Sequence, residues 1–315
     1  MYRHSRLRRA RTPLTLLATA AIASALVATS VGSASASKGT TTSTVAKPTV
    51  VLVHGAFADS SSWNGVIKQL KEDGYPVLAA ANPLRSVSGD ATAVKNLLAT
   101  IDGPVILVGH SYGGAVISNA ARGADNVKAL VYADAFLPDT GESVNELASK
   151  FEGSVIGDVL RPVPITKPDG AKDFDFYIDQ SKFHQAFGAD VSANTARMMA
   201  VTQRPGTGTA LNEPSGEPAW KTIPSWALVG SNDRIIPREL QVFMAERASA
   251  HIEEIRSSPA TCGWSPPGPR PYATTGWPGT DSPTSEMCIR DRPDTAHHPH
   301  AEIAPRVDNN PRADP

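Results

Sequence analysis

One short stretch constrains the fold of this chain more than any other, because a strand pattern runs directly into a glycine-flanked serine. Residues 105–108 are four apolar residues, three of them β-branched, which is typical of a buried strand. The run GHSYGG follows at 109–114, and residues 115–121 have the pattern of a helix with an apolar face. A G-x-S-x-G spacing between a strand and a helix predicts a sharp turn at Ser111, where a Cβ at the glycine positions would clash. A serine that merely starts a helix beside glycines is the alternative.

The composition of the 315 residues narrows the class of protein. A net charge of −1 gives no basis for nucleic-acid binding, and 41% hydrophobic residues suit one sizeable α/β domain with additional segments. The two cysteines, Cys262 and Cys288, both come late, so the region before them has neither a disulfide nor a cysteine metal site. We therefore expect a small-molecule substrate, with no metal and no other cofactor.

The first 36 residues predict a secretory signal peptide. Five arginines fall within residues 3–11, an apolar stretch follows at about 14–31, and Ala-Ser-Ala at 34–36 has the form of a cleavage site. Residues 37–46 are rich in Ser, Thr, Gly and Lys and predict a flexible linker. We expect export, with no stable membrane span after cleavage. An uncleaved membrane anchor is the alternative.

Strand and helix patterns alternate along most of the chain that follows. Such alternation predicts a mostly parallel sheet flanked by helices. Beside the strand before Ser111, strands are expected at 47–53, 76–80, 127–133, 225–230 and 251–255, and helices at 63–70, 91–101 and 237–249. The alternation stops between about residues 139 and 218, where aromatic residues argue against disorder. This insertion predicts a small cap.

Four motifs occur in an order typical of one family. They are HGAF at 54–57, GHSYGG at 109–114, AFLPDTGES at 135–143 and VGSNDRIIP at 229–237. Residues 47–258 thereby resemble the α/β-hydrolase fold, in its small branch of esterases and hydroxynitrile-lyase-like proteins. The resemblance implies one α/β domain over these residues.

The resemblance also implies catalytic roles. Ser111 would attack an acyl carbonyl, and the backbone amides of Ala56 and Tyr112 would bind the oxyanion. Asp233, expected at the carboxyl end of a strand, would orient a histidine base. Asp134 follows another strand and is the rival acid, while Asp233 has the alternative role of a turn residue.

The base of such a triad has no candidate in its expected place. The family's histidine should follow the last strand within a few residues of Ser258, yet no histidine lies between His251 and His297. His251 opens the strand and therefore falls at its wrong end. His54 and His110 are expected to be structural, the first bracing its loop and the second packing beneath the serine.

The sequence changes character at Pro259. Prolines become frequent and apolar periodicity vanishes, so residues 259–315 predict a disordered or aberrant tail. We hypothesise a frameshift. If the reading frame after Ser258 starts at the third base of each codon, the last base of the Ala260 codon (GCN) and the first two bases of the Thr261 codon (ACN) form the codon NAC. This codon encodes His when N is C. The run EMCIRDR at 286–292 also resembles a translated sequencing-library adapter. A natural proline-rich tail is the alternative.

These features predict a carboxylesterase-like serine hydrolase that forms an acyl-enzyme on small esters, although the printed chain lacks the triad histidine and is expected to be nearly inactive. One alternative keeps the fold and changes the chemistry to that of a lyase or a cofactor-free oxidative enzyme. A lyase of the similar type needs a cap lysine near the serine. The candidates are Lys167, Lys172, Lys182 and Lys221. The other alternative is a non-catalytic ligand-binding protein.

Overall fold

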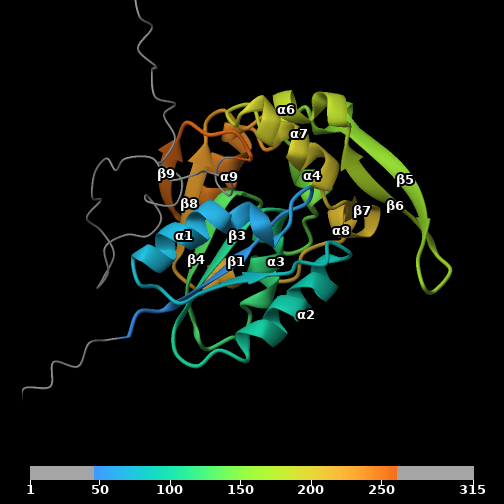
Figure 1. Ribbon diagram of the computed structural model, residues 1–315. Helices are drawn as coiled ribbons and strands as arrows, with labels where there is room; N and C mark the ends of the chain where they lie inside the picture. The colour runs from blue at the N-terminus through green and yellow to red at the C-terminus, as the bar shows by residue number, and fades with distance from the viewer. Residues whose placement is uncertain (1–45, 261–315) are drawn as a thin grey trace, which may run out of the picture. The chain divides into compact units, whose positions relative to one another are not determined.

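A parallel sheet of six strands forms the centre of the computed structural model, which describes residues 46–260 (Figure 1). The strand order is β2-β1-β3-β4-β8-β9, and each neighbouring pair in it is parallel. The strands are β1 Thr49–Val53, β2 Val77–Ala80, β3 Val105–Ser111, β4 Val127–Ala135, β8 Ser225–Gly230 and β9 His251–Ile255. All six predicted strands are present, and they form the parallel sheet that the alternation of strands and helices predicted.

Helices cover both faces of this sheet, because successive strand residues point to opposite sides. On β1, Val50 and Leu52 pack with residues of α1 (Asn64–Glu72), whereas Val51 and Val53 pack with α2 (Val87–Leu98) and α3 (Tyr112–Ala120). Helix α9 (Arg238–Arg247) joins the same core as α2 and α3. The result is a three-layer arrangement whose carboxyl strand ends lie along one edge (Figure 1).

Several helix boundaries differ from those expected, and at two of the helix starts a side-chain cap gives the reason. Helix α2 begins at Val87, four residues early, because the Ser86 side chain accepts a hydrogen bond from the Gly89 amide at 3.1 Å and caps the first turn. The helix predicted from residue 63 is preceded by a 3₁₀ turn, η1 (Ser60–Trp63), which Asp59 caps. In both cases the prediction rested on the apolar repeat, and the capping side chain, Asp59 or Ser86, lies before the first residue of that repeat.

The segment between β4 and β8 contains its own small sheet. Strands β5 (Leu160–Thr166), β6 (Lys172–Ile178) and β7 (Gly206–Thr207) pair antiparallel in that order. The remaining elements are α4 Val144–Ala148, α5 Ile156–Val159, α6 Gln180–Phe187, α7 Ala193–Thr202, α8 Gly208–Asn212 and η2 Ala219–Lys221. The small cap predicted for this segment did not include the hairpin of β5 and β6, whose strands lie side by side in Figure 1.

The signal-peptide, linker and tail predictions fall outside the described residues, apart from residue 46 and residues 259–260. Within the described part, none of the helices combines the length and the apolar character that crossing a membrane requires.

Candidate active site

Ser111 lies at the junction of β3 and α3 with a strained backbone. Its φ of 52° is in the left-handed region, which non-glycine residues rarely adopt. Glycines surround it closely: a Cβ on Gly109 would lie 2.6 Å from the Gly113 carbonyl oxygen, and a Cβ on Gly55 would lie 2.7 Å from the Ser111 Cβ. The turn therefore depends on glycine at these positions, for the steric reason that the motif predicted.

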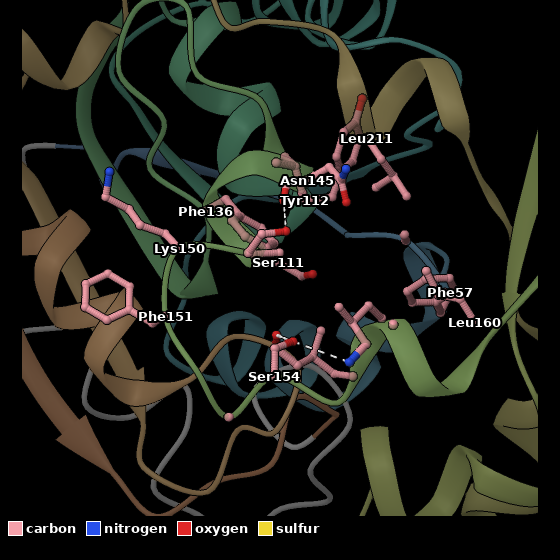
Figure 2. A pocket seen from close by; sticks show the side chains of 18 of the residues that line it. Phe57, Ser111, Tyr112, Phe136, Asn145, Lys150, Phe151, Ser154, Leu160 and Leu211 are labelled. Atoms are coloured by element: carbon pink, nitrogen blue, oxygen red, sulfur yellow. Dashed lines mark hydrogen bonds between the residues drawn. The ribbon is translucent and has the colours of Figure 1, made fainter.

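Ser111 opens onto a cavity of about 470 Å³. Figure 2 shows Ser111 across the cavity from Ser154, with Phe57 and Leu160 on one side and Phe151 on the other. The wall combines residues after β1 and β3 with residues from α4 to β5. Its apolar lining is Ala56, Phe57, Phe136, Val144, Ala148, Phe151, Ile156, Leu160, Leu211 and Ile235. A mostly apolar cavity beside a strained serine is the usual form of a small-molecule site.

The two predicted oxyanion donors, Ala56 and Tyr112, both line this cavity. Tyr112 is the first residue of α3, so its amide is among those without a partner inside the helix. The loop that carries Ala56 is braced by His54, whose Nδ1 lies 2.9 Å from the Gly55 oxygen and whose Nε2 accepts from the Asn82 amide at 3.1 Å. Burial lowers the pKa of His54, which makes it neutral and structural as expected.

The side chain of Tyr112 is anchored away from its amide. Its hydroxyl donates to the Asp90 Oδ2 at 2.8 Å, and Asp90 also accepts from the Arg85 amide at 3.1 Å. Burial raises the pKa of Asp90. Asp90 was not predicted as a site residue. Its contact with Tyr112 joins two separate helices, and the apolar pattern of α2 gives no sign of it.

The two candidate acids lie together. Asp134, which was expected to follow a strand, is the penultimate residue of β4, because this strand extends to Ala135. It is fully buried with a φ of 42°, and its Oδ2 accepts from the Ser257 hydroxyl at 3.2 Å. Asp233 follows β8, and its Oδ1 accepts from the amides of Ile235 and Ile236 at 2.7 and 2.9 Å. Burial, followed by the charge of Asp134, raises the pKa of Asp233 well above its ordinary value. Asp233 therefore stabilises the turn after β8 with one carboxylate oxygen, and it also lies at the carboxyl end of a strand, where the candidate acid was expected.

No described histidine lines the cavity. His110 packs edge-on between Trp63 and Phe187, and burial lowers its pKa to about 4, so it is neutral. His184 contacts the Val191 oxygen at 3.0 Å, and His251 stacks on Trp226. The described residues therefore contain a candidate nucleophile and acid, with no histidine placed as their base.

The segment after β9 is held firmly beside the acids. The Ser257 oxygen accepts from the Asn232 amide at 3.2 Å, and the Ser258 amide donates to Asp190 at 2.7 Å. The Ala260 amide donates to the Phe187 oxygen at 2.9 Å. The described end of this segment, residues 257–260, is thus held by contacts with both the loop after β8 and the cap.

None of the four cap lysines named above is among the residues that line the cavity. Lys221 pairs with Asp139 at 2.6 Å, Lys172 donates to Thr166, and Lys182 donates to the Asp158 oxygen. Lys150 was not among the predicted lysines, but it does line the cavity. Figure 2 shows its amine directed away from Ser111.

Comparisons with known proteins agree with this architecture. The sequence model of the Alpha/beta hydrolase family matches residues 50–263. The "Carbendazim hydrolyzing esterase" of Nocardioides sp. (strain SG-4G) is 36% identical over 113 residues, which are 32% of this chain and 47% of that protein. "Methylesterase 2" of Arabidopsis thaliana is 26% identical over 67% of this chain and 90% of its own length. The crystal structure of polyneuridine aldehyde esterase superposes with a TM-score of 0.60 at 18% identity, over 69% of this chain and 94% of that one.

Proposed function

This chain belongs to the alpha/beta hydrolase family, and on that premise we propose that it is a serine esterase with Ser111 as its nucleophile. The observation that carries the proposal is the strained Ser111 on the wall of a cavity that Ala56 and Tyr112 also line. In this reaction the Ser111 oxygen attacks the ester carbonyl and forms an acyl-enzyme. The amides of Ala56 and Tyr112 stabilise the oxyanion, each contributing about 3–4 kcal/mol, as in a comparable serine hydrolase.

The shape and lining of the cavity favour small esters with apolar acyl or alcohol groups. A volume of about 470 Å³ lies within the ordinary range of small-molecule pockets, and aromatic and aliphatic side chains form most of its wall. The esterase names of the two relatives support ester chemistry of this kind. We also propose that the protein is exported, on the strength of its N-terminal signal pattern.

We propose further that the printed chain is nearly inactive, because no histidine follows β9 before His297. The proton of the Ser111 hydroxyl then has no positioned acceptor, and loss of the base costs on the order of 10⁶-fold in rate in a serine protease. A chain whose reading frame is shifted after codon 258 has a histidine in this part of the sequence if the unseen base of the NAC codon is C, and the contacts of Ser257 with Asp134 and of Ser258 with Asp190 support a position near the acids.

The test uses the printed chain and this frame-shifted chain in parallel. The frame-shifted chain is expected to give an acyl-enzyme burst with p-nitrophenyl acetate and to label with a fluorophosphonate at Ser111. The printed chain is expected to react slower by a factor of about 10³ or more. Ser111→Ala in the frame-shifted chain is the control and should abolish both signals. A folded frame-shifted chain that neither labels nor shows a burst contradicts the proposal.

The other candidate functions have less support. The cap lysines on which the lyase alternative depends lie outside the lining of the cavity. A non-catalytic binding protein has no need for a positive φ at Ser111, since such strain costs about 1–3 kcal/mol and persists where function requires it. Absence of Ser111 labelling together with retained binding of small esters would favour the binding role.

A further inference from the structure

Asp134 and Asp233 were competing candidates for one role in the sequence, yet the fold brings them into one buried site. Asp134 ends up here because β4 and β8 are neighbours in the sheet, and their carboxyl ends share an edge. Both side chains are buried, with 0% exposure at Asp134 and 7% at Asp233. Two carboxyl groups in such surroundings rarely carry two charges, because each disfavours ionisation of the other.

The packing at Gly230 places the Asp134 carboxyl against the residue at which the Asp233 turn begins. A Cβ at Gly230 would lie 2.7 Å from the Asp134 Oδ2 and 2.8 Å from its Cγ, so the Asp134 carboxyl lies directly against this glycine. The Asp233 amide in turn donates to the Gly230 oxygen at 3.2 Å. Glycine at residue 230 therefore leaves the room that the Asp134 carboxyl occupies beside the Asp233 turn.

The donors around the pair are distributed unequally. Asp233 Oδ1 has two amide donors, whereas its buried Oδ2 has no partner among the described residues. Asp134 receives the Ser257 hydroxyl, and Gln241 of α9 reaches the backbone of Gly230. After burial, the charge of the Asp134 carboxyl is the next cause that raises the pKa of Asp233, and the amides of Ile235 and Ile236 act in the opposite direction.

We propose that Asp134 and Asp233 form a carboxyl pair that shares one proton, with Asp134 as a positioning residue for Asp233 and for the segment at Ser257. The pair deepens the proposed function and rests on it, since Asp134 precedes Ala135, the residue of β4 that pairs with Ser111 of β3. The proton belongs to the two carboxyl groups together, and Asp233 has one oxygen fixed by two backbone amides. Asp134 aligns Ser257 by accepting its hydroxyl. The site thus acquires a pH dependence set by two acids together.

The experiment measures the shared proton in the printed chain, so it needs no reaction at Ser111 and stays informative if the proposed function fails. Infrared difference spectra between about pH 5 and about pH 9 follow the protonated-carboxyl band. Asp134→Asn keeps the shape of the side chain, and Asn tolerates the positive φ at this residue. In this variant the midpoint of the band is expected to fall by about one pH unit or more, because the neighbouring charge is gone. The titrating band should be absent in Asp233→Asn, which separates it from other buried acids.

Thermal unfolding provides a second readout. Because the pKa of Asp233 in the folded state lies above its ordinary value of 3.8, its stabilising contribution is present in full below that value and is lost as the pH rises through the folded-state pKa. Asp134→Asn lowers the folded-state pKa, so its melting temperature should fall less steeply than that of the parent over the same range. Asp139→Asn, at an acid paired with Lys221, is the matched control and should follow the parent. If a folded Asp134→Asn protein shows the same midpoint of the protonated-carboxyl band as the parent, the proposal that the two acids share a proton is wrong.

Discussion

At the scale of single residues, the geometry of Ser111 depends on the absence of a side chain at Gly55. The Gly55 α-carbon faces the Ser111 side chain so closely that a methyl group has no space between Ser111 and the His110 carbonyl. The loop after β1 can therefore bring Ala56 next to the serine only with glycine at residue 55. Two motifs that are separate in the sequence, HGAF at 54–57 and GHSYGG at 109–114, thus meet through one steric requirement.

Gly55→Ala is expected to destabilise the protein by about 1–3 kcal/mol, because the new Cβ would lie 2.7 Å from the Ser111 Cβ and 2.8 Å from the His110 oxygen. Chemical denaturation of the printed chain measures the effect. Gly157→Ala is the matched control, since nothing lies within 4 Å of a Cβ there. Equal unfolding free energies for the two variants would show that the loop and the serine are less tightly packed than described.

At the scale of elements, α2 shows how a side chain outside the apolar repeat decides where a helix begins. The apolar repeat predicted a helix from residue 91, but the helix starts at Val87 behind the cap at Ser86. The extra turn matters to the site because it contains Asp90, the acceptor for the Tyr112 hydroxyl. The Ser86 cap thereby fixes the first turn of α2, and Asp90 in this turn holds the side chain of Tyr112, the residue next to Ser111.

Ser86→Ala is expected to cost about 1 kcal/mol, since the Gly89 amide at the start of α2 loses its side-chain acceptor. Thermal and denaturant unfolding should both detect the change. Ser88→Ala, at an exposed residue in the same turn, is the control and should alter stability by less than about 0.5 kcal/mol. A cost at Ser88 as large as that at Ser86 would argue against the cap.

At the scale of the whole molecule, Arg247 ties the segment after β4 to α9. Its guanidinium donates to both carboxylate oxygens of Glu142, at 2.8 and 2.7 Å, and to the Leu137 oxygen at 2.9 Å. Burial alone would raise the pKa of Glu142, but the hydrogen bonds and charge of Arg247, together with the Asp139 amide and the charge of Lys150, outweigh burial and lower this pKa. The stability from this pair is therefore present above the unfolded-state pKa and is lost as the pH falls through the lowered one.

Arg247→Ala is expected to cost about 2 kcal/mol at neutral pH, because three charge-assisted hydrogen bonds are lost at a partly buried position. Arg238→Ala, which removes the more exposed pair with Glu254, should cost less than about 1 kcal/mol. Urea unfolding of the two variants gives the comparison. A loss at Arg238 that matches the loss at Arg247 would mean that burial does not distinguish the two pairs.

The sequence alone determined the features that short-range chemistry sets. Strand alternation located all six strands of the central sheet, and the glycines around Ser111 predicted the turn, because both depend on residues within a few positions of each other. The sequence also showed by itself that no histidine lies between His251 and His297, where the triad base is expected.

Only the tertiary structure decided which distant side chains meet. Asp134 and Asp233 were alternatives in the sequence, and they are neighbours because β4 lies beside β8 in the sheet. The contact of Tyr112 with Asp90 and the β5–β6 hairpin likewise depend on packing between segments that the sequence leaves unpaired. The physical reason is that strand order, and with it the set of side chains at the carboxyl edge, follows from how apolar faces pack across the whole domain.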